Sequence, residues 1–238
     1  MDYLPSVYYR YATRHGDKGN DVAVLQLNLP GLAVDGVFAD LTEAAVLEWQ
    51  RAHGLIDDGI AGLATQQSII QTKARRPEKE KRLPSRLLKS IAANESGFAL
   101  AAAGPHLGDE GWDVGAFCRS SGSLFPDQPF LRSAYHVGES SKWTAHHVRQ
   151  TYDNLPSPVA SRYLTELAQG DAERFRWQLA ILAHNWPAAA LNIAKNGSAT
   201  PDDDAAASWI EAATSNRLHT PREWVLSYVE RATVYVQW

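Results

Sequence analysis

Apolar side chains recur three and four positions apart in two stretches near the start of the chain, which is the spacing of one face of an α-helix. The segments that follow these stretches are rich in Asp, Gly and Thr, which favour turns and helix starts. The pattern therefore predicts short amphipathic helices joined by tight turns. The helices are expected at residues 20–29 and 41–53, with Val22, Leu25 and Leu29 buried in the first and Val46 and Trp49 sharing a face of the second.

The turns themselves repeat at an offset of 23 residues. Each repeat has an Asp-Gly pair, an apolar residue, and a Thr six residues after the glycine, at Asp35-Gly36 with Thr42 and at Asp58-Gly59 with Thr65. Each Asp-Gly pair can supply the positive φ of a tight turn, and the residues around each Thr can cap the next helix. Asp40 and Glu43 are spaced as a capping box. We therefore predict a bundle of three short helices.

The length and composition are those of a globular protein. The chain has 238 residues, enough for one or two compact domains. Hydrophobic residues make up 45% and charged residues 21%, which excludes disordered and fibrous proteins. No apolar stretch approaches the roughly 20 residues of a membrane span, and the first residues lack the basic start and apolar core of a secretory signal. We therefore expect a protein that is made in a cytoplasm and has no membrane span.

Charge is unevenly distributed. Lys and Arg total 23 against 27 Asp and Glu, and the formal charge of −4 gives no support for nucleic-acid binding. Residues 73–89 depart from this balance, with eight basic and two acidic side chains. Because dense like charge stays solvated and Pro77 and Pro84 interrupt regular structure, residues 73–84 are interpreted as a linker between two domains. The alternative is that the basic run attracts an anionic polymer such as a cell-wall glycan.

The motifs before this run occur in a specific order. They stand at Gly16 and Gly19, residues 22–26, 35–38 and 42–50, Gly54-Leu55, and residues 58–65. In this order they resemble the peptidoglycan-binding domain type 1 family, with Trp49 in place of a Phe. The resemblance implies a wall-binding domain over residues 14–72, with binding residues Asp35, Gly36, Asp58 and Gly59. Most of these positions are also core or turn positions, so the resemblance favours the fold more strongly than the ligand.

A further amphipathic helix is expected after the linker, opened by Pro84 and ended by Gly97. Glu95 lies four residues after Ile91 and seven after Leu88, so helical geometry places its carboxylate at the end of the apolar face. A carboxyl there is partly desolvated and can hold a proton near neutral pH for a leaving group, as a glycosidase acid must. The alternative is a Glu that faces solvent or bonds a loop amide.

Two segments in this half carry a second resemblance. Residues 91–98 and 108–117 resemble the catalytic helix and the following loop of the superfamily of goose-type lysozymes and soluble lytic transglycosylases. Ala183-His184-Asn185 falls where that superfamily often has Ala-Tyr-Asn, and residues 220–238 resemble its last, aromatic helix. The resemblance implies a lysozyme-like catalytic domain over residues 85–238.

On that comparison Glu95 is the catalytic acid and Asp109 is the acid that positions water, with Asp113 of the same loop in reserve. An inverting hydrolase needs a second carboxylate about 6.5 to 9.5 Å from the acid, whereas a lytic transglycosylase can use the N-acetyl group of its substrate and one Glu. We expect hydrolysis, with transglycosylation by Glu95 alone as the alternative. Each loop acid could instead bond nearby amides.

Substrate contacts are expected beside these segments. Cys118 stands where the superfamily usually has Gln, and His184 where it usually has Tyr. Indole faces suit pyranose rings, so Trp112 and Trp186 are expected in the cleft, and other tryptophans, including Trp177 and Trp209, in the core. The aromatic residue of the last helix is either Trp224 or Tyr228. The expected substrate-binding residues are Ser96, Trp112, Phe117, Cys118, His184, Asn185, Trp186 and Tyr228.

Metal chemistry and disulfides have little support. Cys118 is the one cysteine, so it has no partner for an internal disulfide or for a cysteine-based zinc site. His146-His147 are adjacent, and adjacent residues of a helix rarely ligate one ion. We expect no metal and no cofactor.

The sequence therefore predicts an all-α protein with a small wall-binding bundle and a larger lysozyme-like domain, preceded by an extension at residues 1–13. We expect it to bind bacterial peptidoglycan as a monomer and to cleave the β-1,4 bond between N-acetylmuramic acid and N-acetylglucosamine. The arrangement resembles bacteriophage endolysins, which are made in the host cytoplasm and reach the wall through a holin pore. The rival interpretation is a non-catalytic wall-binding or virion structural protein in which Glu95 is a structural acid.

Overall fold

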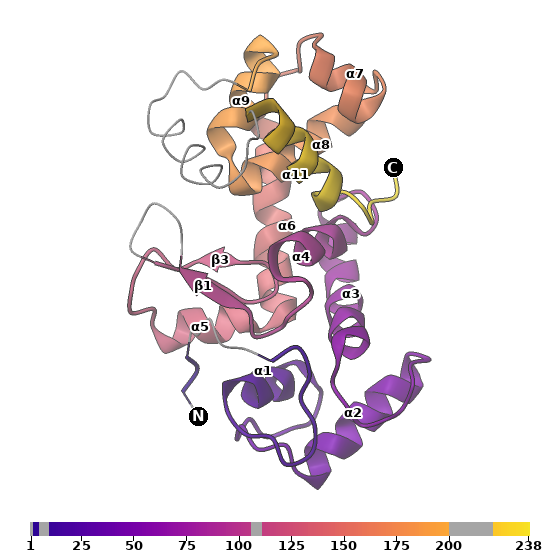
Figure 1. Cartoon of the computed structure of the whole chain (residues 1–238), viewed down its shortest axis with the longest axis vertical. Coiled ribbons are helices and arrows are strands. Elements are labelled where there is room, and N and C mark those ends of the chain that lie inside the picture. Colours follow the sequence, from indigo (N-terminus) through magenta and orange to yellow (C-terminus); the bar gives the residue numbers. More distant parts are fainter. Residues whose placement is uncertain (1, 5–9, 106–110, 200–220) are drawn as a thin grey trace. The chain divides into compact units, whose positions relative to one another are not determined.

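The computed structural model describes residues 2–4, 10–105, 111–199 and 221–238. This part of the chain is mostly helical, as predicted, and carries one small three-stranded sheet (Figure 1). The chain divides into two compact units: unit 1 contains residues 1–77 and 92–143, and unit 2 contains residues 78–91 and 144–238. Within the described residues, no helix has both the length and the apolar character of a membrane span.

The first two predicted helices are present in unit 1. α1 spans Asn20–Asn28 and α2 spans Asp40–Ala52, and the predicted apolar positions Val22, Leu25 and Val46 are buried. The predicted capping box is wrong, because the N-cap of α2 is Ala39, which makes no side-chain cap bond. Asp40 already occupies a helical position, and its carboxylate lies 3.0 Å from Nε2 of His15.

α3 spans Leu63–Glu80 and continues into the basic run. The prediction of an interrupted linker at residues 73–84 is therefore wrong as far as the end of this helix, which contains Pro77. Pro77 and Glu78 lie three and four positions after Ala74, and all three are buried, while Arg75, Arg76 and Lys79 are exposed. These three cations are thus solvated along one face of a helix, and no break in the helix is needed to keep them in water.

Unit 1 also contains the segment that follows the predicted catalytic helix, so the units do not coincide with the two predicted domains. α4 spans Leu87–Ser96 and α5 spans Gln128–Tyr135, and α6, Val137–Asn154, begins in this unit. Between α4 and α5 lie the antiparallel strands β1 (Ala103–Pro105), β2 (Trp112–Val114) and β3 (Arg119–Ser120). The sheet was not predicted, because strands of two or three residues are too short to show alternation. α5 packs beside β2 (Figure 1).

A fully buried asparagine joins α1 to the start of α6. Nδ2 of Asn28 donates to the carbonyls of Val24 at 2.9 Å and Tyr135 at 2.8 Å, and Oδ1 accepts from the N–H of Val137 at 2.9 Å. All three bonds are shielded from water, where an unmade hydrogen bond is costly. The N-terminal helices and the α5–α6 corner are therefore tied together within one unit.

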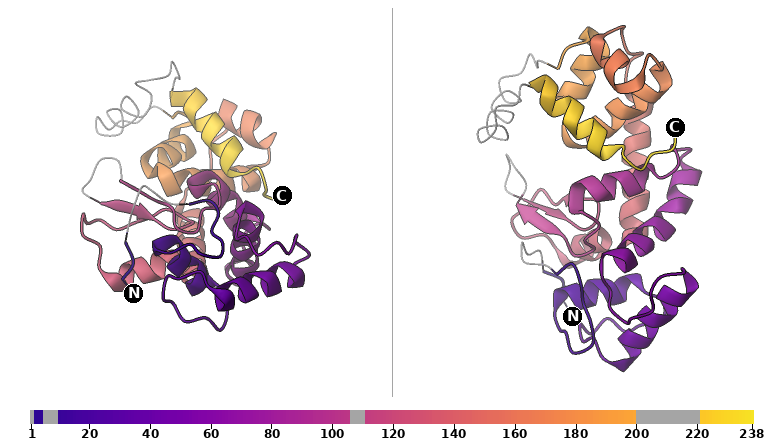
Figure 2. Two further views of the ribbon diagram at one scale, coloured as in Figure 1. Left: turned by 60° about the horizontal axis from the view of Figure 1, so that its bottom comes forward. Right: turned by 45° about the vertical axis from the view of Figure 1, so that its right-hand side comes forward.

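Unit 2 is built around α8, Ala172–Asn185, which contacts α7 (Arg162–Ala168), α9 (Pro187–Asn196) and α11 (Pro221–Ala232). In both views of Figure 2 these orange and yellow helices form one cluster. The predicted last helix is present but ends at Ala232, short of the predicted end at Trp238. Residue 220, where the predicted helix begins, lies outside the described residues.

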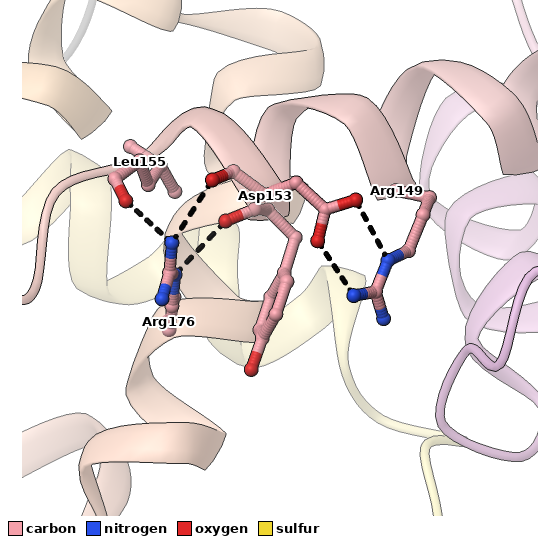
Figure 3. A network of polar contacts seen from close by, with 5 residues as sticks. Arg149, Asp153, Leu155 and Arg176 are labelled. Carbon is pink, nitrogen blue, oxygen red and sulfur yellow. Dashed lines mark hydrogen bonds and ion pairs between the residues drawn. The ribbon is translucent and has the colours of Figure 1, made fainter.

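The end of α6 shows how unit 2 satisfies its main chain. Nε of Arg176 donates to the carbonyl of Tyr152 at 2.9 Å, and Nη2 donates to those of Asp153 and Leu155 (Figure 3). Tyr152 and Asp153 are in the last turn of α6, where carbonyls have no partner within the helix, and Leu155 directly follows the helix. The side chain of Asp153 pairs with Arg149 one turn earlier. The cluster in Figure 3 thus combines capping of the helix end by Arg176 with an ion pair along the helix.

Candidate functional site

Glu95 stands at the carboxyl end of α4, as predicted. Leu88 and Ile91 on the apolar face of the helix are buried, and Glu95 is half-buried at its end. Gly97 follows the helix with a φ of 58°, a left-handed conformation that suits glycine and ends the helix. Nδ2 of Asn94 donates to Oε1 of Glu95 at 3.1 Å. The carboxylate thus has a fixed position at a partly shielded helix end.

Two other predicted site residues lie close to Glu95 within unit 1. Sγ of Cys118 donates to the main-chain carbonyl of Glu95 at 3.2 Å. Burial raises the pKa of the Cys118 thiol, and the negative charges of Glu95 and Asp113 raise it further. Both carboxylates therefore act on the same thiol, which stays protonated and can donate. Asp113 was expected in a loop and lies in strand β2; Asp109 lies outside the described residues.

Ser96 and Phe117, two further predicted site residues, are buried next to Glu95 and Cys118 in the sequence. Oγ of Ser96 donates to the carbonyls of Ala92 at 2.9 Å and Ala116 at 3.0 Å, and the side chain is buried. Phe117 has no exposed surface. The structure gives no support to the expectation that these two residues contact substrate, because the hydroxyl is already bonded and the ring is in the core. They hold the end of α4 against the turn between β2 and β3.

The same turn depends on a glycine. Gly115 has a φ of 80°, and a Cβ there would lie 2.3 Å from the carbonyl oxygen of Ala134 in α5. No side chain fits so close to a main-chain atom without displacing it. Gly115 therefore allows the turn that carries Cys118 to approach α5.

Trp112 remains available for a ligand in part. It lies in β2 and is half-exposed, and Nε1 donates to the carbonyl of Leu124 at 3.2 Å. This bond fixes the indole while part of its surface stays in water. The prediction of Trp112 as a sugar contact stays a prediction.

The predicted sugar contacts in unit 2 fall into two groups. Trp186 and Tyr228 are 4% and 3% exposed, and both rings pack on Trp224 at centroid distances of 5.4 and 5.2 Å. The structure gives no support to their expected role as sugar contacts, because both side chains are buried in an aromatic cluster with Trp224. His184 is half-buried with its ring 6.2 Å from that of His147, and Asn185 is exposed. Trp177 is 5% exposed and belongs to the core, as predicted, while Trp209 lies outside the described residues.

The Asp-Gly turns of unit 1 are each built around a buried glutamine. Nε2 of Gln26 donates to Oδ1 of Asp35 at 2.8 Å, the carbonyl of Val37 at 3.1 Å and Oγ1 of Thr42 at 3.0 Å. Its Oε1 accepts from the N–H of Gly36 at 2.8 Å. One side chain thus joins the turn to the helix that follows it.

Gln50 repeats this arrangement in the second turn. Nε2 donates to Asp58 Oδ1 at 2.9 Å, the carbonyl of Ile60 at 3.0 Å and Thr65 Oγ1 at 3.1 Å, and Oε1 accepts from the N–H of Gly59 at 3.1 Å. The sequence repeat is therefore a repeated hydrogen-bond network. Its signal in the sequence is a Gln that precedes each Asp-Gly pair by eight or nine residues.

These bonds give the predicted wall-binding residues a structural role. Hydrogen bonds from the N–H two residues on, and then from the glutamine, lower the pKa of both Asp35 and Asp58. Gly36 and Gly59 are buried and have φ values of 72° and 71°. The carboxylates and glycines make the turns, so the structure gives no direct support to their use as ligand contacts.

Sequence reasoning missed the residues that connect the N-terminal region to the loop after α4 and to the α5–α6 corner. Gln66 is buried and bonds Tyr11 and Leu100, and Asn28 bonds Tyr135 and Val137. A polar residue on an otherwise apolar helix face was the available signal, but this pattern does not identify the distant residue that it bonds. Within the described residues, no group of three or more His, Cys, Asp or Glu side chains could hold a metal ion.

Comparisons with known proteins give one sequence relative, one solved structure and one family model. A zinc D-Ala-D-Ala carboxypeptidase from Streptomyces albus G is 44% identical over 63 residues, which are 24% of this chain and 25% of that protein. This chain therefore matches about a quarter of that relative's length. The crystal structure of a Burkholderia AP3 phage endolysin aligns over 94% of this chain and 96% of that one, with 17% identity and a TM-score of 0.25. A TM-score this low says nothing of fold or function. Residues 18–69 match the family model described as "Putative peptidoglycan binding domain", and the chain therefore carries a domain of this family at its N-terminal end.

Proposed function

We propose that the protein is a glycosidase of the bacterial cell wall that cleaves the β-1,4 bond between N-acetylmuramic acid and N-acetylglucosamine. One observation carries the proposal: Glu95 is half-buried at the end of α4, in the same compact unit as a domain of a peptidoglycan-binding family. A glycosidase acid needs a shielded carboxyl and a second acid nearby. A domain that holds the polymer raises the concentration of bonds near that acid.

In the proposed reaction Glu95 donates its proton to the glycosidic oxygen as the bond to the anomeric carbon breaks. A water molecule attacks that carbon from the opposite face and gives its proton to a second carboxylate. Asp113 is supported in this second role by its position in β2 and its effect on Cys118. Asp109, which the resemblance assigns to the role, lies outside the described residues and stays part of the proposal.

Substitution of Glu95 tests the proposal. We expect Glu95→Gln to lower the rate of clearing of peptidoglycan suspensions by at least about a hundredfold, because general acid catalysis contributes on this scale. Glu48→Gln, on the exposed side of α2, is the matched control and should clear walls like the parent. Equal clearing by the Glu95→Gln protein would remove the assignment. A parent protein that binds walls and never clears them would favour the non-catalytic alternative.

Mass spectrometry of the released fragments separates the two chemistries. Reducing ends are expected from hydrolysis, whereas 1,6-anhydro ends would mean that Glu95 acts alone in a transglycosylation. Asp113→Asn and Asp109→Asn then identify the second acid. Only substitution of the acid that holds the water should lower the clearing rate strongly.

Under this proposal the protein acts as a phage endolysin. It would be made in the host cytoplasm, reach the wall through a holin pore and work there as a monomer. Expression in a bacterial host with and without a holin tests the route, and lysis that needs the holin is the expected result. Sedimentation equilibrium of the purified protein tests the monomer.

A further inference from the structure

The sequence left the N-terminal segment without a role, but its described residues bond to other parts of unit 1. The N–H of Tyr3 donates to Oε1 of Gln128 at 2.7 Å, and Nε2 of Gln128 donates to the Tyr3 carbonyl at 2.9 Å. Asn20 pairs with the main chain of Leu4 in the same two-way manner, at 3.1 and 3.0 Å. Tyr3 is buried as a result. The first described residues are therefore an integral part of the unit.

A buried glutamine then holds the main chain at Tyr11. Nε2 of Gln66 donates to the Tyr11 carbonyl at 2.7 Å, and Oε1 accepts from the N–H of Leu100 at 2.9 Å. Gln66 is 5% exposed, so water does not compete for these bonds. Two residues later, Thr13 and Ala61 exchange two main-chain hydrogen bonds. One side chain thus ties Tyr11 to the loop that follows α4.

The ring of Tyr11 lies beside the end of α4. Its Cε1 and Oη atoms are 3.8 Å from the position that a Cβ would take at Gly97, which is exposed. Gly97 comes two residues after Glu95, and two residues span at most about 7 Å of chain. Tyr11 nevertheless keeps 52% of its surface exposed. A large aromatic ring on a fixed main chain is therefore presented to solvent close to the proposed catalytic acid.

We propose that Tyr11 binds an N-acetylated amino sugar of the β-1,4-linked glycan strand, in a subsite next to the bond that Glu95 cleaves. This inference rests on the proposed function and adds a substrate-binding residue to it. The ring offers an apolar face to a pyranose, and its hydroxyl offers a hydrogen bond at the edge. Because Gln66 and the Thr13–Ala61 pair fix the main chain, little order has to be gained when sugar binds. The N-terminal segment thus adds a sugar contact beside the end of α4.

Binding of a soluble N-acetylglucosamine hexamer, followed by tryptophan fluorescence, tests the subsite. In proteins that carry Glu95→Gln, so that no probe is cleaved, we expect Tyr11→Ala to weaken binding about tenfold, the equivalent of one lost aromatic contact. Tyr11→Phe should retain most of the affinity, because it keeps the ring. Phe125→Ala is the matched control, since Phe125 is 89% exposed in the same unit and has no proposed role. In the active protein, Tyr11→Ala should raise KM about tenfold and change kcat less than about twofold.

The outcomes separate this subsite from the proposed reaction. Because the contacts that fix Tyr11 are made by its main chain, Tyr11→Ala should fold, and circular dichroism checks this. Unchanged hexamer affinity in the folded Tyr11→Ala protein, or a loss equal to that of Phe125→Ala, overturns the subsite. If the parent never cleaves glycan but Tyr11→Ala still weakens hexamer binding, the glycosidase proposal fails and the subsite stands. If the parent cleaves glycan and Tyr11→Ala leaves KM unchanged, the subsite fails alone.

Discussion

The Asp-Gly turns of the N-terminal region and the end of α4 use polar side chains in different ways. In the turns, Gln26 and Gln50 bind the carboxylates, the glycine N–H groups and the threonine hydroxyls of their own repeat. At the end of α4, the bonds that hold the chain come from Ser96 and Cys118, and the carboxylate of Glu95 is left at a half-buried surface. In the turns, the carboxylates are part of the hydrogen-bond networks that hold the fold. At the end of α4, other side chains hold the fold around Glu95.

The two regions also differ in how far apart the hydrogen-bond partners lie in the sequence. The partners of Gln26 lie 9 to 16 residues away, within one turn and the next helix. Ser96 and Cys118 reach across 20 and 23 residues, and Gln66 reaches 34 residues to Leu100. A motif alone therefore describes the turns well, but the surroundings of Glu95 depend on loop packing. The substitutions below test this division.

Gly115→Ala should have the largest effect on stability. A Cβ at this position would meet the Ala134 carbonyl at 2.3 Å in a left-handed conformation, so α5 or the turn must move. We expect a loss of about 3 kcal/mol or more in the free energy of unfolding, together with displacement of Cys118 and loss of activity. Gly122→Ala is the control, because Gly122 also has a positive φ but a Cβ there meets no atom within 4 Å. It should cost only about 1 kcal/mol. Equal losses in urea titrations of the two proteins would mean that the close approach to α5 is unimportant.

Gln50→Ala and Gln26→Ala should come next. Each truncation leaves buried N–H, carbonyl and hydroxyl groups of a turn without their partner, which costs about 2 to 3 kcal/mol. Because the two networks match, the two losses should agree within about 1 kcal/mol. Gln150→Ala on the exposed side of α6 is the control and should leave the urea midpoint unchanged. A large loss of unfolding free energy for one substitution and none for the other would show that the two networks do not contribute equally to stability.

The same division decides what the sequence predicted. The helices at residues 20–28 and 40–52 and the end of α4 at Gly97 follow from local spacing and local turn residues, and the structure confirms them. The continuation of α3 through the basic run was not predicted. The high density of charge suggested a linker, although Ala74 and Pro77 share a buried face of the helix. The sequence also does not show that Trp186 is buried against Trp224, because these two residues are far apart in the chain.

Acid should weaken the turns through Asp35 and Asp58. Their folded pKa values are lowered by hydrogen bonds to the charged form, so the stability they contribute is present above the unfolded value, about 4, and is lost as the pH falls through the folded value. Asp58→Asn keeps the shape but removes the charge, so its urea midpoint should depend less on pH below about 4 than that of the parent. At neutral pH its effect should be smaller than that of Gln50→Ala. Parallel pH curves for Asp58→Asn and the parent would show that the turn carboxylate does not titrate with unfolding.

The smallest expected effect tests whether Glu95, Asp113 and Cys118 lie together in solution. Because burial raises the pKa of the Cys118 thiol, its reaction with a maleimide at pH 8 should be at least about tenfold slower in the folded protein than in urea. Glu95 and Asp113 raise the same pKa, so Glu95→Gln and Asp113→Asn should each lower it and increase the folded-state rate about twofold. Glu48→Gln, on exposed α2, is the control and should leave the rate unchanged. Acceleration by Glu95→Gln without acceleration by Asp113→Asn would place Asp113 too far from Cys118 and Glu95 to be the second acid. Asp109 would then be the expected water-holding acid.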